Sequence, residues 1–282
     1  MDWAAFLAEP KAKRQGYWGK RSSAAKRARL LRTLDEDGQL ALRGGGGPGA
    51  GAWLLPREEG DELLPDAHFL ANLRMRFSCD VCAPGARCQH RKADGSLCGE
   101  PLDAKGWHAR KCGCGGSRDY RHNSLRDWSA PWHCAQTGHR ATTEQRVPAW
   151  DRQNPDTGAW EEAVLDVATR DPVTNALVYL DWSVTCEHSN NDARRQARAR
   201  TDGVAAAQAV DRKRARYPPA GGELIPAVLE SGGRPADELV AFVRSYGWDL
   251  PDADRSAVIS ATWRKIQRCL AFGNAEMLLS AT

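Results

Sequence analysis

The sequence predicts a mixed α/β fold in which a small cysteine-rich module precedes a core of strands and helices. Three observations support this prediction. Residues 162–188 form two strand-like runs joined by a turn, seven of the nine cysteines lie between residues 79 and 134, and helix and strand patterns alternate from residue 121 onward. Their order is helix, three strands, helix, strand and then helices, which predicts an αβββαβ core.

Length and charge limit the kind of protein. A chain of 282 residues allows one or two domains, and the net charge of +4 conceals basic clusters at 11–32, 74–126 and 194–216. Such clusters suit a polyanion, although solvated helix faces give similar runs. No apolar run approaches the length of a membrane span, so we expect no membrane partner. The first residues lack the apolar core of a signal peptide, which predicts an intracellular protein.

The N-terminal part is predicted to be basic and helical over residues 1–35. The default interpretations are a solvated helix or a disordered arm, with a nucleic-acid contact as the alternative. A glycine-rich linker follows at 43–52, because its glycines do not favour regular structure. A helical lead-in is then expected, with Asp66 as a candidate helix cap. The predicted divisions are a basic segment and linker at 1–52, the lead-in at 53–78, a zinc-binding module at 79–118 and the core at 119–282.

The cysteine-rich module contains little apolar material, so a metal ion would have to supply its stability. The clearest ligands are Cys98, His108 and Cys112, whose spacing suits a zinc knuckle. The fourth ligand stays open: Cys88 completes the even spacing Cys-x9-Cys-x9-His-x3-Cys, whereas the CxxC pair Cys79 and Cys82 is the alternative. Four protein ligands leave no open position, so a structural Zn²⁺ is expected.

The core is predicted to begin with a helix over residues 121–134, capped by Asn123 or Ser124. Arg121 and His122 lie where a phosphate would be met, and capping or packing is the equal alternative. A short strand at 142–150 carries Glu144, and residues 154–158, NPDTG, form a turn.

The two strands of residues 162–188 each present one aspartate. Alternation in the second strand places Asp181 on one face and the apolar Leu180 and Trp182 on the other. If the strands pair, Asp166 and Asp181 meet over one site, and two carboxylates are what a hard cation such as Mg²⁺ needs. The alternative is a pair of strand-end aspartates held by solvent or an arginine.

A long basic helix is predicted over residues 189–217, capped by Asn190 or Asn191 and weakened at Gly203. It carries Lys213 near its end, with Arg212 and Arg214 as expected phosphate contacts. A strand at 223–230 and helices at 236–246 and 254–271 complete the core.

This element order, with its two strand aspartates, resembles the PD-(D/E)XK or restriction-like nucleases. More closely, the chain resembles the zinc-knuckle and endonuclease region at the C-terminal end of non-LTR retrotransposon polyproteins. The segments that carry the resemblance include CGEPLDAKGWHARKC, GGSRDYRHNSLRD, AVLDVATRDP, YLDWSVTCEHS, DRKRARYPP and GNAEMLLSA, and they lie between residues 64 and 282.

The resemblance implies metal-dependent nicking of a DNA target strand in the nucleus, with DNA and element RNA as partners. It places Asp166 and Asp181 as catalytic ligands of Mg²⁺ or Mn²⁺ and Glu144 as a third carboxylate. The family's lysine position, two residues after Asp181, holds Ser183 here, so Lys213 on the next helix is the candidate. Two other interpretations are an inactive zinc-containing nucleic-acid-binding protein and a zinc-ribbon interaction protein.

Overall fold

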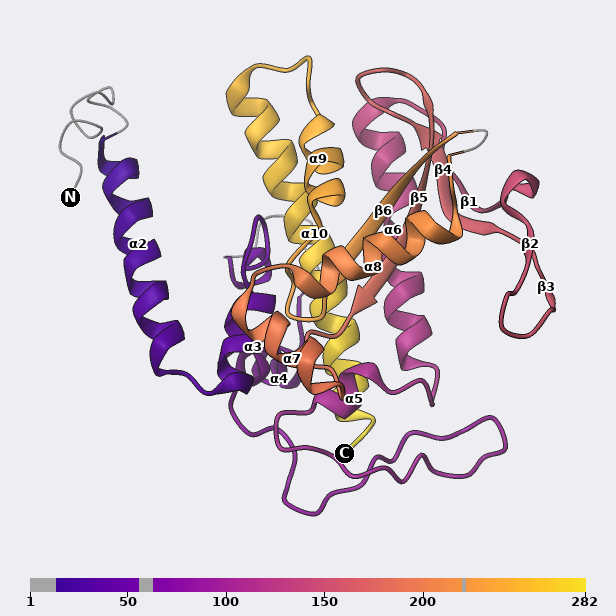
Figure 1. The fold of residues 1–282 in the computed structure, drawn as a ribbon. Helices are drawn as coiled ribbons and strands as arrows, with labels where there is room; N and C mark the ends of the chain where they lie inside the picture. The colour runs from indigo at the N-terminus through magenta and orange to yellow at the C-terminus, as the bar shows by residue number, and fades with distance from the viewer. Residues whose placement is uncertain (1–13, 56–62, 220–221) are drawn as a thin grey trace.

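Figure 1 shows the computed structural model of the chain, which describes residues 14–55, 63–219 and 222–282. The fold is mixed α/β, as the sequence predicts, and is centred on a four-stranded sheet in the order β1-β4-β5-β6. These strands are β1 (Thr142–Arg146), β4 (Val164–Arg170), β5 (Leu177–Thr185) and β6 (Glu223–Glu230). Two short strands, β2 (Arg152–Gln153) and β3 (Trp160–Glu161), form a separate hairpin around the predicted turn.

The sheet is antiparallel except at one edge. β1 pairs antiparallel with β4, and β4 with β5, whereas β6 lies parallel to β5. A parallel pair needs a long crossover, and helices α7 (Asp192–Arg200) and α8 (Val204–Arg216) provide it. The remaining helices are α2 (Arg14–Thr33), α3 (Glu36–Gly44), α4 (Asp66–Arg76), α5 (Trp107–Lys111), α6 (Ser117–Thr137), α9 (Asp237–Ser245) and α10 (Asp252–Leu279).

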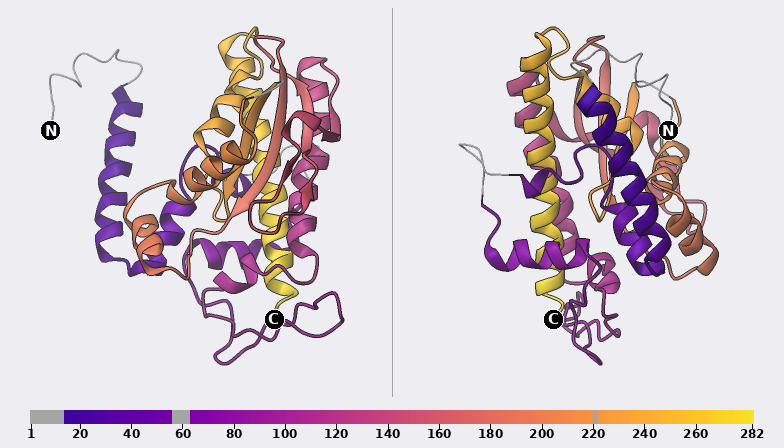
Figure 2. Two further views of the ribbon diagram at one scale, coloured as in Figure 1. Left: turned by 45° about the vertical axis from the view of Figure 1, so that its right-hand side comes forward. Right: turned by 90° about the vertical axis from the view of Figure 1, so that its left-hand side faces the viewer.

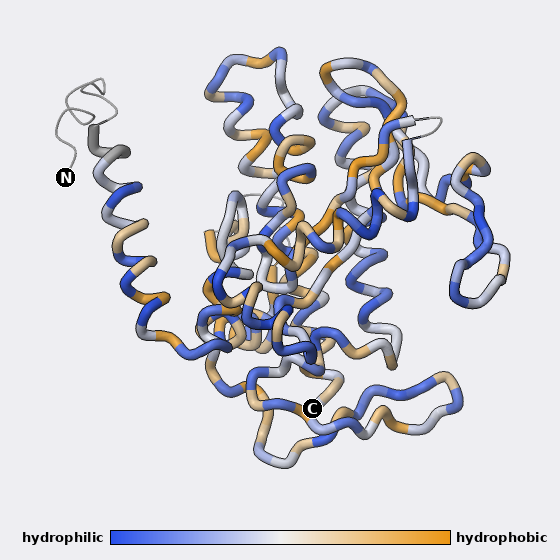
Figure 3. The backbone as a smooth tube through the Cα atoms, in the orientation of Figure 1, coloured by the Kyte–Doolittle hydropathy of each residue, from blue (hydrophilic) through white to orange (hydrophobic). Residues whose placement is uncertain are grey.

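Helices cover both faces of the sheet (Figures 1 and 2). On one face, Trp182 and Leu229 pack against α6, α9 and α10 in the main hydrophobic cluster. On the other face, Val228 packs against Ala206 and Val210 of α8. Hydrophobic residues accordingly follow the central strands in Figure 3. The predicted alternation of the second hairpin strand is therefore confirmed for the buried Leu180 and Trp182.

Three helix predictions need correction. Asp66 does not cap α4, because it is the first residue of that helix and Pro65 stands at the cap position without a side-chain hydrogen bond. The predicted helix 189–217 is two helices, because α7 ends at Arg200, Thr201 is extended, and Gly203, the residue before α8, has φ 75°. The Asn191 side chain caps α7 by accepting a hydrogen bond from the backbone N–H of Arg194. Helix α6 begins at Ser117, so neither Asn123 nor Ser124 caps it, and Pro131 lies inside this helix.

The glycine-rich segment at 43–52 is packed into the body of the protein and does not act as a spacer. Gly49 has φ 71°, and a Cβ added there would come within 2.4 Å of the Trp263 ring on α10. A Cβ on Gly44 would meet the Glu187 side chain, so both positions require glycine for close approach. Part of the predicted N-terminal helix, residues 1–13, lies outside the described residues, as do residues 56–62 of the lead-in.

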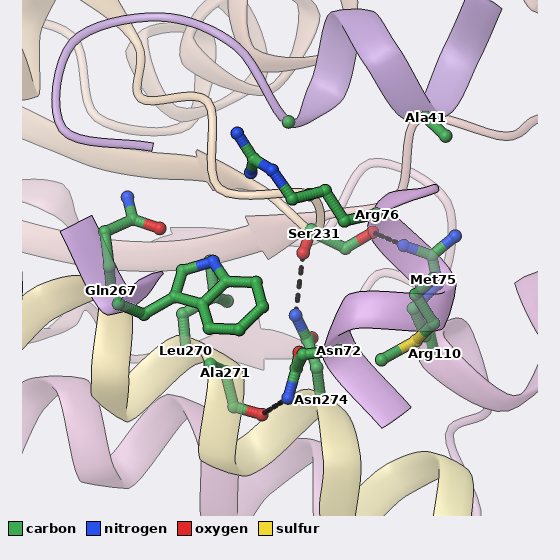
Figure 4. Close-up of a pocket in the computed structure, with 13 residues that line it drawn as sticks. Ala41, Asn72, Met75, Arg76, Arg110, Ser231, Gln267, Leu270, Ala271 and Asn274 are labelled. Atoms are coloured by element: carbon green, nitrogen blue, oxygen red, sulfur yellow. Dashed lines mark hydrogen bonds between the residues drawn. The ribbon is translucent and has the colours of Figure 1, made fainter. Parts of the chain in front are cut away.

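A small polar cavity lies where α4, α10 and the turn after β6 meet (Figure 4). Asn72 donates to the Ala271 carbonyl at 2.7 Å, and Asn274 donates to the Ser231 carbonyl at 2.7 Å. The cavity measures about 20 Å³, room for a single water. These hydrogen bonds link α4 to α10 and α10 to the turn after β6. The cavity itself is too small for a substrate. No helix in the described part of the chain is long and apolar enough to cross a membrane.

Candidate functional site

Four predicted zinc ligands converge in the cysteine-rich module. The ligand atoms of Cys88, Cys98, His108 and Cys112 all lie within 4.8 Å of one another, and among the described residues this is the one group with metal-ligand geometry. Cys112 Sγ lies 3.8 Å from both Cys88 Sγ and Cys98 Sγ, and Cys98 Sγ lies 3.5 Å from His108 Nε2. Cys79 and Cys82, the alternative ligands, lie outside the group, so Cys88 is the fourth member.

These separations match a zinc tetrahedron. With Zn–S near 2.3 Å and Zn–N near 2.05 Å, the edges of a regular tetrahedron are about 3.8 Å for S···S and about 3.6 Å for S···N. Backbone N–H groups at His90, Glu100 and Cys114 donate to the sulfurs of Cys88, Cys98 and Cys112, each from two residues further on. The bond from Glu100 lowers the pKa of Cys98, which favours the thiolate that a metal requires.

The local fold explains the convergence. Residues 88–98 form a hairpin in which Cys98 N donates to the His90 carbonyl and Gly99 N to the Cys88 carbonyl, which brings the first two cysteines together. Asp103 then caps α5 by accepting from the backbone N–H groups of Trp107 and His108. The cap fixes the turn of helix that presents the imidazole.

The module is docked on the core and is not suspended from it. Gln89 N donates to the Ala281 carbonyl at 2.9 Å, and His90 Nε2 lies 3.0 Å from Ser280 Oγ, both just beyond the end of α10. Leu278 and Ala281 pack with the buried cysteines in one hydrophobic cluster. An ion in this module would therefore brace the C-terminal end of α10.

The second candidate site is built on the two strand aspartates. Val167 pairs with Leu180, and continuing this register by one residue places Asp166 opposite Asp181. Their residues are 8% and 9% exposed. Asp166 Oδ2 accepts the backbone N–H of Trp182 at 2.6 Å, and Asp166 Oδ1 lies 2.9 Å from His122 Nε2 on α6. The two strands pair as predicted, and they bring the Asp166 and Asp181 carboxylates together.

Lys213 reaches this site from α8. Its Nζ lies 2.5 Å from Asp181 Oδ2 and donates to the Trp182 carbonyl at 3.2 Å. Burial raises the pKa of Asp181 above its ordinary range; the ammonium of Lys213 opposes the rise, and the Asp166 carboxylate adds to it. The site therefore contains two buried carboxylates, one lysine and one histidine drawn from β4, β5, α8 and α6.

Glu144 lies beside this pair in the sheet but points elsewhere. The β1–β4 register pairs Thr143 with Val167 and Gln145 with Leu165, which places Glu144 opposite Asp166. Its backbone has φ 53°, and its carboxylate lies 2.6 Å from Arg126 Nη1 with 65% of the side chain exposed. Arg126 is a site neighbour that sequence reasoning missed, because its position one helical turn after His122 carries no motif.

The four expected phosphate contacts have different surroundings. Arg121 is 3% exposed and donates to Asn274 and to the Arg110 carbonyl, so it is a packing group and cannot meet a phosphate at the surface. His122 contacts Asp166, as described above. Arg214 is paired with Glu238 at 2.7 Å, and Arg212 is exposed on α8.

The chain is therefore a mixed α/β protein with a Cys₃His group that could hold a structural metal ion. Comparison with protein-family models, with curated proteins and with solved structures finds no match in any of the three. The resemblance to retrotransposon endonucleases therefore stays a prediction.

Proposed function

We propose that this chain is a divalent-metal-dependent DNA endonuclease of the restriction-like type, derived from a non-LTR retrotransposon, which nicks one strand of its target in the nucleus. One observation carries the proposal. Asp166 and Asp181 face one another, buried, across adjacent strands, and Lys213 lies against Asp181. A carboxylate pair can hold a divalent ion that activates a water, and an adjacent lysine can stabilise negative charge on the phosphate.

The carboxylates suit Mg²⁺ or Mn²⁺. Although no third His, Cys, Asp or Glu atom completes a metal set here among the described residues, Mg²⁺ commonly takes one or two carboxylates and fills its other positions with waters and substrate phosphate. The raised pKa of Asp181 also fits a metal site, because a bound cation would offset the repulsion between the two buried carboxylates. When bound, the ion would lower the pKa of a water and offset charge on the phosphate.

Side chains of the protein would position the attacking water, the phosphate and the Asp166 carboxylate. Lys213 is held by Asp181 and by the Trp182 carbonyl, so its ammonium meets the peptide group that precedes Ser183, the residue that replaces the usual lysine. From there it would orient the attacking water and add positive charge near the phosphate. His122 would hold Asp166 in place through the 2.9 Å contact.

The zinc module would contribute stability and phosphate contacts. Its four ligands leave no position for substrate, so a structural role suits it. Arg87, Arg91 and Lys92 are exposed on the hairpin that carries Cys88 and Cys98, and such cations bind the DNA backbone without reading sequence.

Plasmid nicking tests the proposal. Zinc-loaded protein should convert supercoiled DNA to the open circle with Mg²⁺ or Mn²⁺, and both D181N and K213M should abolish conversion. D171N is the matched control, because Asp171 lies in the exposed turn between β4 and β5, where its Oδ1 accepts two backbone N–H groups that an asparagine oxygen can also accept. Nicking by D181N at the wild-type rate would refute the active-site assignment.

The second candidate is an inactive nucleic-acid-binding protein that has kept the fold. The observation that favours it is the Lys213–Asp181 ion pair, which already neutralises one carboxylate without a metal. Calorimetric titration of Mn²⁺ separates the two functions: the nuclease should bind Mn²⁺ in the wild type and lose it in D181N. Retained DNA binding with neither Mn²⁺ binding nor nicking would identify the inactive protein.

A further inference from the structure

Helix α2 is unusual in its charge and exposure. From Lys20 to Arg32 it carries six cations and no carboxylate. Most of its residues from 19 to 33 are exposed, including Leu30, whose side chain is 45% exposed. The N-terminal end of the helix extends away from the rest of the molecule in Figure 1 and in the left view of Figure 2. A long cationic helix in this position is available to a partner.

The distribution of the cations selects the kind of partner. At 100° per residue the side chains of Lys20, Arg21, Lys26, Arg29 and Arg32 spread over about 240° of the helix circumference. Between residues 19 and 29 the only apolar side chains are alanines, so this part of the helix has no apolar face for a membrane surface or a hydrophobic groove. Hydrophilic and weakly hydrophobic residues alternate along it in Figure 3. A partner that presents negative charge to more than one side of the helix fits this pattern.

The major groove of duplex DNA is such a partner. It is about 12 Å wide, close to the 10–12 Å diameter of an α-helix, and phosphates line both of its walls. Serines and alanines at residues 22–25 would let the helix approach the bases closely.

The helix is held in place at its C-terminal half. The Gln39 amide donates to the carbonyls of Leu31 and Leu34, which fixes the end of α2 against α3. Arg27 Nη2 lies 2.8 Å from Asp202 Oδ1, just before α8 begins. A helix tethered in this way does not have to be ordered when it binds, which lowers the entropic cost of association.

Asp202 connects this helix to the proposed site. The same carboxylate accepts from Arg43 at 2.5 Å and from Arg234 at 3.1 Å, so three segments of the chain meet there. Two residues later α8 begins, and this helix carries Lys213. The orientation of α2 is therefore set by the residues that also set the start of α8.

We propose that α2 inserts into the major groove of duplex DNA and contacts phosphates on both walls. The inference rests on the proposed function, because it names the surface by which the same protein holds its DNA. It differs from that function in being a binding property that does not require cleavage.

The test is binding of the full chain to a labelled DNA duplex of roughly 30 bp, about three turns, by fluorescence anisotropy without added Mg²⁺ or Mn²⁺. The test variant changes four cations of α2 and spares the Arg27 tether: K20Q/K26Q/R29Q/R32Q. Glutamine is as good a helix former as lysine or arginine, so α2 should persist. The control variant removes four exposed cations elsewhere: R74Q/R118Q/R170Q/R244Q.

The α2 variant should bind at least about tenfold more weakly, and its slope of log affinity against log salt should shrink by up to about 3.6, or 0.9 per phosphate contact. The control should change that slope by less than about 1. The charge-preserving variant K20R/K26R/R29K/R32K should bind as the wild type does. An unchanged slope in the α2 variant, or an equal loss in the control, would overturn the proposal.

An RNA duplex of the same length tests the groove itself. The A-form major groove is too narrow and deep for a helix, so the α2 variant should lose much less affinity for RNA than for DNA. Equal losses on both duplexes would overturn the groove placement. The nicking assay tests the nuclease separately: wild type without nicking but with the α2-dependent slope would refute cleavage and leave the inference standing.

Discussion

Glu230 offers a quantitative test of how the end of the sheet is built. It lies at the end of β6, is 3% exposed, and accepts the backbone N–H of Ala206 through Oε1 at 3.1 Å. Burial, with the nearby Glu187 carboxylate, raises the pKa of Glu230 from its ordinary 4.5 to about 7. The unfolded chain therefore releases this proton at lower pH than the folded protein does.

The sign of the effect follows from that difference. Between pH 4.5 and about 7 the folded state binds more protons at Glu230, so the stability that this group contributes is complete below pH 4.5 and is lost as pH rises through about 7. At about 1.36 kcal/mol for each tenfold change in proton affinity, the loss is about 3 kcal/mol by pH 8. The substitution E230Q removes the titrating group and keeps an oxygen that can accept from Ala206.

Urea unfolding of zinc-loaded protein at pH 5 and at pH 8 measures this contribution. The free energy of unfolding of E230Q relative to the wild type should be about 2.5 kcal/mol more favourable at pH 8 than at pH 5, because part of the loss has already occurred at pH 5. E223Q is the matched control, because Glu223 begins the same strand but is exposed, and it should show no such change. A difference between E230Q and wild type that is the same at both pH values would refute this account of Glu230.

The other predictions concern the metal group, the buried ion pair and one close backbone contact. Purified protein should contain one zinc per chain by atomic absorption; C98S should lose it, whereas C79S should keep it because that cysteine is exposed and outside the group. K213M should lower the free energy of unfolding in urea by about 3 kcal/mol at pH 8, and by less at pH 5, where the buried carboxylate left behind is more readily protonated. G49A should cost about 2 kcal/mol more in thermal unfolding than G85A, because both glycines have φ above 70° but only the first meets a side chain.

Local periodicity in the sequence predicts much of the fold. β6 spans the predicted 223–230, and the two hairpin strands bring Asp166 opposite Asp181, because a period of two fixes which side chains share a face. The ligand set Cys88, Cys98, His108 and Cys112 agrees with the even spacing of the sequence. The hairpin between the first two cysteines brings them side by side although nine residues separate them.

Contacts between distant segments could not be predicted in the same way. The sequence leaves a phosphate contact and packing as equal alternatives for Arg121; it packs, because Gly273 leaves space for its side chain and Asn274 accepts its hydrogen bond. The 2.5 Å approach of Lys213 to Asp181 depends on a crossover that places α8 against the sheet face bearing Asp181. Neither contact can be recognised from a local sequence pattern, because Arg121 and Asn274 are 153 positions apart, and Lys213 and Asp181 are 32 positions apart.

The metal group and the acidic pair are joined by a short segment of chain and the start of α6. Cys112 lies five residues before Ser117, where α6 begins, and His122 lies a turn and a half into that helix. An ion at Cys112 would fix the start of α6, and α6 in turn sets the distance between His122 and Asp166. Loss of the ion would therefore loosen His122 before it disturbs the sheet, whose strands are held by their own ladder of hydrogen bonds. A metal ion in this module would then do more than stabilise its own loop, because it would help to position one of the four side chains in the acidic site.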